Sequence, residues 1–242
     1  RGQVWDPDGV PVAEFPAGNA SSPRIAGLGA GRAFALAIGG QGVPGASAPT
    51  TGRFLRDGKP EGSPAYSVIN KDVTEPDGPH GNALPAALAA GTDDLFLAWT
   101  TDAPFSRGQA RNVFDMALLD SKGVVKRQFL VAGAHPEKRI MAPDAVWDGA
   151  GYRVAWHEQV ADSPRGSLYN AVFTAWVDPA DGSPVALRLA GRFEAPAVNA
   201  AVASDGGGLG LVVYEQHPEK ADTPILIGFR MLRAERPVAA PR

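Results

Sequence analysis

The sequence contains no cysteine, and this excludes disulfide bonds, thiolate catalysis and metal sites built on cysteine. It also has no apolar run close to the ~18 residues that a membrane span needs; stretches such as 83–90 and 209–214 are far shorter. Basic residues form no cluster, and the formal net charge is −3. Nothing in the sequence therefore indicates binding to nucleic acid or anionic lipid, or a transmembrane segment.

Glycine and proline are abundant, with 29 and 22 residues, while the hydrophobic fraction of 44% is close to that of globular proteins. This composition is typical of many short strands joined by turns around an ordinary core. The chain starts at Arg1 without an initiator methionine or apolar leader, so we expect a processed chain or a piece of a longer one. We expect it to be secreted or on the cell surface, or else periplasmic.

A repeat of nearly 60 residues is the main signal in the sequence. Residues 143–156 read PDAVWDGAGYRVAW, and residues 85–99 read PAALAAGTDDLFLAW. Weaker copies lie at 23–38 and 199–214, and the apolar residues that close the four copies, Ile38, Trp99, Trp156 and Tyr214, are 61, 57 and 58 residues apart. Large rings at a fixed repeat position usually fill a core. We therefore predict that the three aromatic residues are buried.

Each copy continues with a third apolar run that contains a phenylalanine. These are Phe54, Phe114, Phe173 and Phe229. In most copies an Asp/Gly turn and a fourth run follow, as at residues 120–123 and 178–182. Four antiparallel strands at this period form the blade of a β-propeller. The predicted fold is all-β, a propeller with four recognisable repeats and an N-terminal hairpin, giving four to five blades.

With its Pro, Asp-Gly, Gly-Tyr and Trp pattern, the chain resembles the repeat propellers of secreted proteins from GC-rich soil bacteria. The resemblance covers nearly the whole chain and implies one domain over residues 1–242. The predicted parts are a hairpin at 1–18 and repeats at about 23–78, 85–139, 143–195 and 199–242. The resemblance implies no particular activity, because such propellers serve as lectins, adhesion modules, enzyme domains and assembly subunits.

The two ends of the repeat array leave an alternative open. Residues 1–18 read as two adjacent strands, whereas the last repeat has its own third strand at 225–232 and a candidate fourth near Val238. Either the hairpin completes the last blade, or an open blade edge remains. An unpaired edge attracts other strands, so the second alternative predicts assembly with another chain.

Long and varied loops follow the second and fourth strands, at residues 39–51, 69–84, 100–111, 132–142, 157–167 and 215–223, while the turns within hairpins are short. Function usually lies in such loops. All four histidines are placed there by sequence, and they are candidate ligand-binding residues: His80, His135, His157 and His217. They lack a short metal-ligand spacing, so we expect no metal and no cofactor.

Three acids in the same loops are candidate catalytic residues: Asp102, Glu158 and Glu215. Glycoside hydrolysis needs two carboxyl groups a few ångström apart, and Glu158 and Glu215 occupy neighbouring blades. Solvated acidic residues at the rim of a propeller have the same positions in sequence, however. One identical sugar site per blade is disfavoured because Thr100, His157 and Glu215 stand at equivalent positions.

The sequence favours a non-enzymatic recognition or assembly module of an extracellular bacterial protein. Its partner would be a protein subunit or a glycan, bound through the long-loop face or a strand edge. A carbohydrate-active enzyme of glycosidase type that uses the loop carboxylates is the alternative, and the sequence does not decide whether the chain is an enzyme.

Overall fold

The computed structural model describes most of the predicted strands of the chain. The described residues are 2–5, 8–15, 24–28, 33–38, 50–55, 59, 66–68, 83–104, 110–120, 123–130, 140–161, 168–180, 187–192, 195–218 and 223–233. They divide into two compact units, Arg1–Ile140 and Met141–Arg242. The prediction that the whole chain is one domain stays a prediction.

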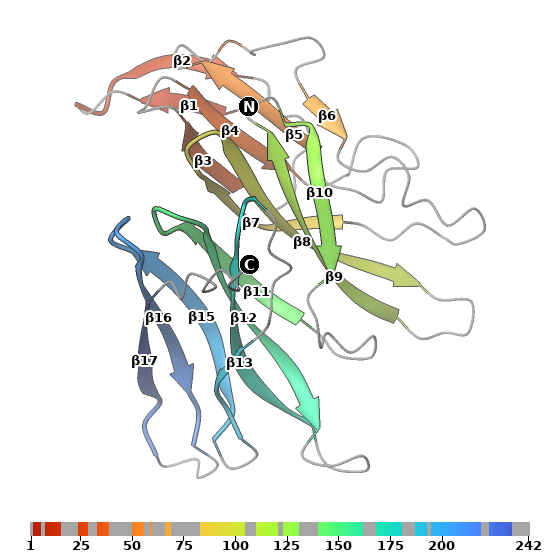
Figure 1. Ribbon diagram of the computed structural model, residues 1–242, viewed down its shortest axis with the longest axis vertical. Helices are drawn as coiled ribbons and strands as arrows, with labels where there is room; N and C mark the ends of the chain where they lie inside the picture. Colours follow the sequence, from red (N-terminus) through yellow and green to blue (C-terminus); the bar gives the residue numbers. More distant parts are fainter. Residues whose placement is uncertain are drawn as a thin grey trace, which may run out of the picture. The chain divides into compact units, whose positions relative to one another are not determined.

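The first unit contains a hairpin and two four-stranded antiparallel sheets (Figure 1). The hairpin is β1–β2, and the sheets have the orders β3-β4-β5-β6 and β10-β9-β8-β7. Their strands are β1 (Gly2–Trp5), β2 (Pro11–Phe15), β3 (Arg24–Leu28), β4 (Ala33–Ile38), β5 (Thr50–Leu55), β6 (Tyr66–Val68), β7 (Ala83–Ala90), β8 (Asp94–Pro104), β9 (Ala110–Asp120) and β10 (Val125–Leu130).

The second unit contains a four-stranded sheet, β11-β12-β13-β14, and a three-stranded sheet, β15-β16-β17. Both are antiparallel meanders in chain order (Figure 1). Their strands are β11 (Ile140–Trp147), β12 (Tyr152–Ala161), β13 (Leu168–Val177), β14 (Leu187–Ala190), β15 (Ala197–Ser204), β16 (Leu209–Gln216) and β17 (Leu226–Arg233). Of the described residues, none forms a helix that is long and apolar enough to cross a membrane.

The predicted all-β fold of four-stranded antiparallel propeller blades is confirmed. Three of the repeats form complete four-stranded sheets, and the predicted N-terminal hairpin is present as β1–β2. The fourth repeat has three strands in the part that the structure describes, and the candidate strand near Val238 lies outside that part. The pairing proposed for the hairpin would join the two units, so both alternatives for it stay predictions.

Each unit has its own apolar core between two sheets. In the first unit, small residues of β4, among them Ala35 and Ala37, pack with Leu97 and Trp99 of β8. In the second unit, Ala155 of β12 packs with Tyr214 of β16. Trp99, Trp156 and Tyr214 are 2%, 1% and 5% exposed, which confirms the predicted burial of the repeat aromatics.

Candidate functional site

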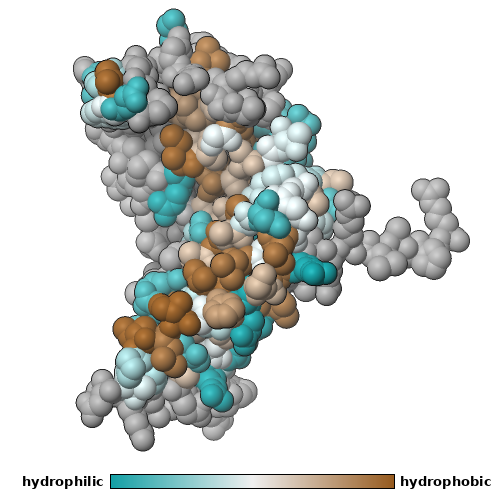
Figure 2. All heavy atoms as spheres, turned by 90° about the vertical axis from the view of Figure 1, so that its left-hand side faces the viewer, coloured by the Kyte–Doolittle hydropathy of each residue, from teal (hydrophilic) through white to brown (hydrophobic). Residues whose placement is uncertain are grey.

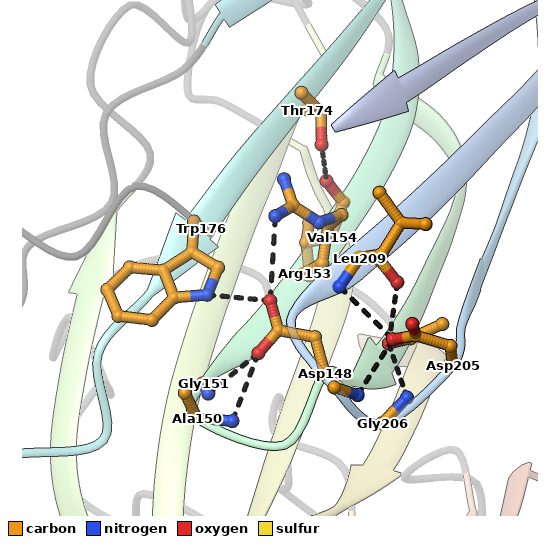
Figure 3. A network of polar contacts seen from close by, with 12 residues as sticks. Asp148, Ala150, Gly151, Arg153, Val154, Thr174, Trp176, Asp205, Gly206 and Leu209 are labelled. Atoms are coloured by element: carbon orange, nitrogen blue, oxygen red, sulfur yellow. Dashed lines mark hydrogen bonds and ion pairs between the residues drawn. The ribbon is translucent and has the colours of Figure 1, made fainter. Parts of the chain in front are cut away.

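A buried carboxylate joins the turns at one end of the second unit. Asp148 follows β11 and is fully buried. Figure 3 shows the indole of Trp176 and the guanidinium of Arg153 both pointing at its carboxylate, at 2.9 and 3.5 Å. The backbone N–H groups of Ala150 and Gly151 also donate to this carboxylate. These four donors satisfy the buried charge, which would otherwise cost several kcal/mol.

The same turn touches the turn of the next sheet. The backbone N–H of Gly208 donates to the carbonyl oxygen of Asp148 at 2.6 Å. Gly149 has a φ of +95°, and a Cβ at this position would overlap with the carbonyl of Gly206. Only glycine combines that backbone conformation with so close an approach. The two sheets of this unit are therefore locked together at their short turns.

A second polar cluster links the same two sheets beyond this lock. It consists of His157, Asn199, Glu215 and His217, and we call it the seam cluster. His217 Nε2 lies 3.0 Å from Glu215 Oε2, and the side chain of Asn199 also hydrogen-bonds to Glu215. The backbone N–H of Asn199 donates to Nδ1 of His157 at 3.2 Å. The four residues thus form one continuous chain of contacts.

A β-bulge in β15 makes this chain of contacts possible. The pairing of β15 with β16 shifts between Val198 and Ala201, and Asn199 takes a φ of +52°. Asparagine tolerates this left-handed conformation better than other non-glycine residues. In the bulge, the backbone N–H of Asn199 points at His157, and the side chain of Asn199 contacts Glu215. Asn199 was not among the residues predicted from the sequence, and its only signal there is an asparagine that interrupts the alternation of the strand.

Burial and hydrogen bonding shift the pKa values of two members of the cluster. His157 is only 3% exposed, and this burial lowers the pKa of its imidazole. Because Nδ1 accepts a hydrogen bond, the neutral ring carries its proton on Nε2. The hydrogen bonds from His217 and Asn199 lower the pKa of Glu215. Glu215 is therefore a carboxylate at neutral pH, and its side chain is 36% exposed.

The predicted loop positions of four candidates are wrong, because Asp102 lies in β8, His157 and Glu158 lie in β12, and Glu215 lies in β16. The repeat pattern predicts that the second strand ends at Trp156, but β12 continues to Ala161 because it pairs with β13 over its whole length. His157 therefore lies within a central strand and faces the last sheet. His217 does lie just beyond β16, where its backbone N–H donates to the carbonyl of Pro196.

The structure does not bring Glu158 and Glu215 together. Neighbouring residues of a strand point to opposite faces of its sheet. Ala155 and Tyr214 pack in the core between the two sheets. Glu158 lies three residues after Ala155 in β12, and Glu215 lies one residue after Tyr214 in β16. Both carboxylates therefore point away from that core. Glu158 is 4% exposed and accepts a hydrogen bond from Nε1 of Trp156 at 3.4 Å. The two carboxylates thus lie on opposite sides of the sheet pair.

Of the remaining candidates, Asp102 alone lies among the described residues. Asp102 lies in β8, where its backbone pairs with Asn112 in the first unit. His80 and His135 lie outside the described residues. Within the part of the chain that the structure describes, no group of three or more potential metal ligands is found.

Comparisons with known proteins give similarities of fold only. No family model and no curated protein matches the chain. Among solved structures, an endo-arabinase from Bacteroides thetaiotaomicron aligns with a TM-score of 0.47 and 13% identity, over 91% of this chain and 78% of that one. A Trypanosoma rangeli sialidase aligns with a TM-score of 0.49 and 7% identity, over 93% and 40%. An α-L-arabinofuranosidase from Lactobacillus brevis aligns with a TM-score of 0.46 and 10% identity, over 92% and 70%.

Proposed function

We propose that the chain is a carbohydrate-recognition module of an extracellular protein, and that the seam cluster is its ligand site. The observation that carries the proposal is the pair Glu215 and His217, joined at 3.0 Å with both side chains more than one third exposed. The pair presents a charged acceptor beside an imidazole, while Asn199 adds an amide.

These groups suit a ligand that is rich in hydroxyl groups. A sugar hydroxyl both donates and accepts hydrogen bonds, and its natural partners are a carboxylate beside a donor or a ring nitrogen. The cluster is also held in place before any ligand arrives, because Asn199 is fixed by His157 and His217 is fixed by Pro196. Such preorganisation reduces the entropy lost on binding.

The charge of the cluster favours neutral over acidic sugars. Glu215 is ionised at neutral pH because its pKa is lowered by His217 and Asn199. A ligand carboxylate or sulfate beside it would be repelled. The repeat aromatics Trp156 and Tyr214 are buried and offer no stacking platform, so we expect weak binding that depends on the polar contacts.

Glycoside hydrolysis is the second candidate function. In its favour, Glu215 is kept ionised by two hydrogen bonds, as a catalytic base or nucleophile must be. The reaction also needs a protonated acid on the other side of the glycosidic bond. Glu158 does not face Glu215, so this acid would have to be another residue.

Calorimetric titration with neutral oligosaccharides tests the first proposal. The probes are arabino-, xylo-, cello- and malto-oligosaccharides, compared with oligogalacturonides as acidic probes. We expect binding to at least one neutral series, and about a tenfold or greater loss of affinity in Glu215→Gln, the effect of removing one hydrogen bond to a charged group. Arg192→Gln, exposed in the same unit, is the matched control and should bind normally.

Two results would contradict the proposal. The first is that none of the neutral probes binds, and the second is that Glu215→Gln binds them as well as the unmodified protein does. Reducing-sugar release should be measured on the same samples. Hydrolysis that Glu215→Gln abolishes while its binding persists would replace recognition by the second candidate.

A further inference from the structure

The last sheet of the second unit differs from the other blades in having one strand fewer. The described residues form three four-stranded sheets, whereas β15, β16 and β17 form a sheet of three. In these described pairings β17 is joined to β16 alone. The other side of β17 therefore has no neighbouring strand in the part of the chain that the structure describes. An edge of this kind pairs readily with a further strand.

The outer face of this sheet is apolar and exposed. The exposed apolar residues of this face, which we call the open face, are Leu211, Ile227, Phe229 and Met231, with exposed fractions of 38%, 69%, 61% and 62%. Glu215 and Arg233 lie on the same face of the sheet. The backbone pairing places Met231 beside Leu211, and Phe229 beside Val213. Figure 2 shows brown, apolar surface gathered over the lower part of the molecule, where β16 and β17 lie in Figure 1.

The same face is buried in the complete blades. In the repeat, Leu211 corresponds to Ala35 and Phe96, which are 1% and 0% exposed. Val213, which is only partly buried, corresponds to Ala98 and Ala155, both fully buried. The open face is thus a blade face that lacks its usual cover. Exposed apolar patches with a polar rim commonly mark docking surfaces.

The charges along the open edge indicate what docks there. Strand β17 carries Arg230 and Arg233, both exposed, and no acidic residue. Among the described residues, the guanidinium of Arg230 donates only to the carbonyl oxygen of its neighbour Phe229. Its charge is therefore available to an incoming carboxylate. A strand that is rich in lysine or arginine would be repelled. A second copy of β17 would also place arginine against arginine.

We propose that β17 accepts an extended segment of another protein as a fourth strand. This segment has apolar residues at alternate positions and carboxylates between them. The backbone hydrogen bonds of the new ladder provide affinity, as in other cases of strand addition. The apolar side chains extend the open face, and the carboxylates, on the other face of the sheet, lie near Arg230.

A synthetic peptide of alternating valine and glutamate, with blocked ends, is a suitable probe. Hydrogen exchange of the intact protein, followed by mass spectrometry, reports on the amides of β17. Without peptide, we expect the amides of β17 to exchange faster than those of β16, because an edge strand is protected on one side only. Saturating peptide should slow the exchange of β17 about tenfold or more and leave the first unit unchanged.

Two variants locate the binding. Phe229→Lys removes part of the open face, and Arg230→Glu reverses the charge of the edge; each should weaken peptide binding about threefold or more, at the level of an exposed ion pair or side-chain contact. Both side chains are exposed, so folding should persist. Arg192→Glu is the matched control, with an exposed arginine outside the edge, and should bind as the unmodified protein does. Replacing the glutamates of the peptide by lysine should reduce binding in the same way.

The proposal is overturned if the peptide leaves the exchange of β17 unchanged, or if Arg230→Glu binds it normally. It is also overturned if β17 is already as protected as β16 in the free protein. In that case deletion of residues 1–18 would show whether the N-terminal hairpin of the same chain protects β17, because the protection would then be lost. Protection by a second copy of the chain would appear as a dimer in size-exclusion chromatography. Glu215→Gln should retain peptide binding, so this proposal and the carbohydrate proposal fail separately.

Discussion

The backbone N–H of Asn199 donates to Nδ1 of His157 across the two sheets of the second unit, at 3.2 Å. This single bond places a buried imidazole, a bulged asparagine and the exposed pair of Glu215 and His217 in one network. It also requires that His157 be neutral, because a protonated imidazole has no free acceptor. Protonation of His157 would therefore affect both the contact between the two sheets and the proposed ligand site.

This coupling predicts a dependence of stability on pH. Burial lowers the pKa of His157 in the folded chain, so the unfolded chain takes up a proton first as the pH falls through about 6.5. Where the unfolded state binds more protons, stability decreases as the pH decreases. We expect the free energy of unfolding, from urea titrations, to be lower at pH 5.5 than at pH 7.5.

The variant His157→Gln separates this effect from other titrations. It should be less stable at pH 7.5 but should lose less stability on going to pH 5.5. The lowered pKa of Glu215 acts in the same direction only at more acidic pH, below about 4.5. An equal loss in the variant and the unmodified protein would show that His157 is not the titrating group.

Replacing the buried carboxylate of Asp148, at the contact between the turns of the two sheets, should be strongly destabilising. Asp148→Ala leaves the charge of Arg153 without its partner and removes the acceptor of Trp176. Breaking a buried charge pair in this way costs about 3–5 kcal/mol. Asp178→Ala is the control, because among the described residues the carboxylate of Asp178 accepts just one hydrogen bond, an exposed one from the backbone N–H of Ala180, and we expect a loss of about 1 kcal/mol or less. Similar losses of unfolding free energy in the two variants, measured by urea unfolding, would argue against a stabilising role of the Asp148 contacts.

Two glycines of the same turns form a matched pair. Gly149 and Gly206 both have positive φ, +95° and +73°, so alanine is strained at either position by about 1–2 kcal/mol. A Cβ at Gly206 meets nothing within 4 Å, whereas one at Gly149 overlaps with the carbonyl of Gly206. Gly149→Ala should therefore lower the thermal midpoint more than Gly206→Ala does. The reverse order would mean that the turns do not touch in solution.

Chelation should leave thermal stability unchanged. The histidines have no metal-ligand spacing in the sequence, and the described residues contain no group of three potential ligands. We expect the same melting temperature with and without EDTA. A decrease that zinc or calcium restores would reveal a site and contradict this expectation.

The fold was predictable because its signal repeats. Proline, an Asp/Gly turn and a terminal aromatic residue recur at nearly constant spacing, and Trp99 and Tyr214 are buried as their positions indicate. The end of the second strand was not predictable. In sequence, Trp156 looks like the end of a strand, yet the pairing with β13 continues for five residues beyond it. Pairing of that kind is decided by the partner strand.

The site was predictable only in part, for a similar reason. Glu215 and His217 were recognised as polar candidates near the end of a buried strand, although Glu215 lies within β16 and not after it. Nothing local shows that Asn199 lies in a bulge. Asp148 lies within the repeat copy at 143–156, yet its indole donor, Trp176, is 28 residues away in sequence. Hydrogen bonds between elements that are distant in sequence have no local pattern, so the roles of these residues emerged only from the structure.

The close approach of Gly149 to Gly206 also restricts how this sequence can change over time. Two turns that meet backbone to backbone leave no room for an inserted residue, and a longer turn in one sheet would push against the other.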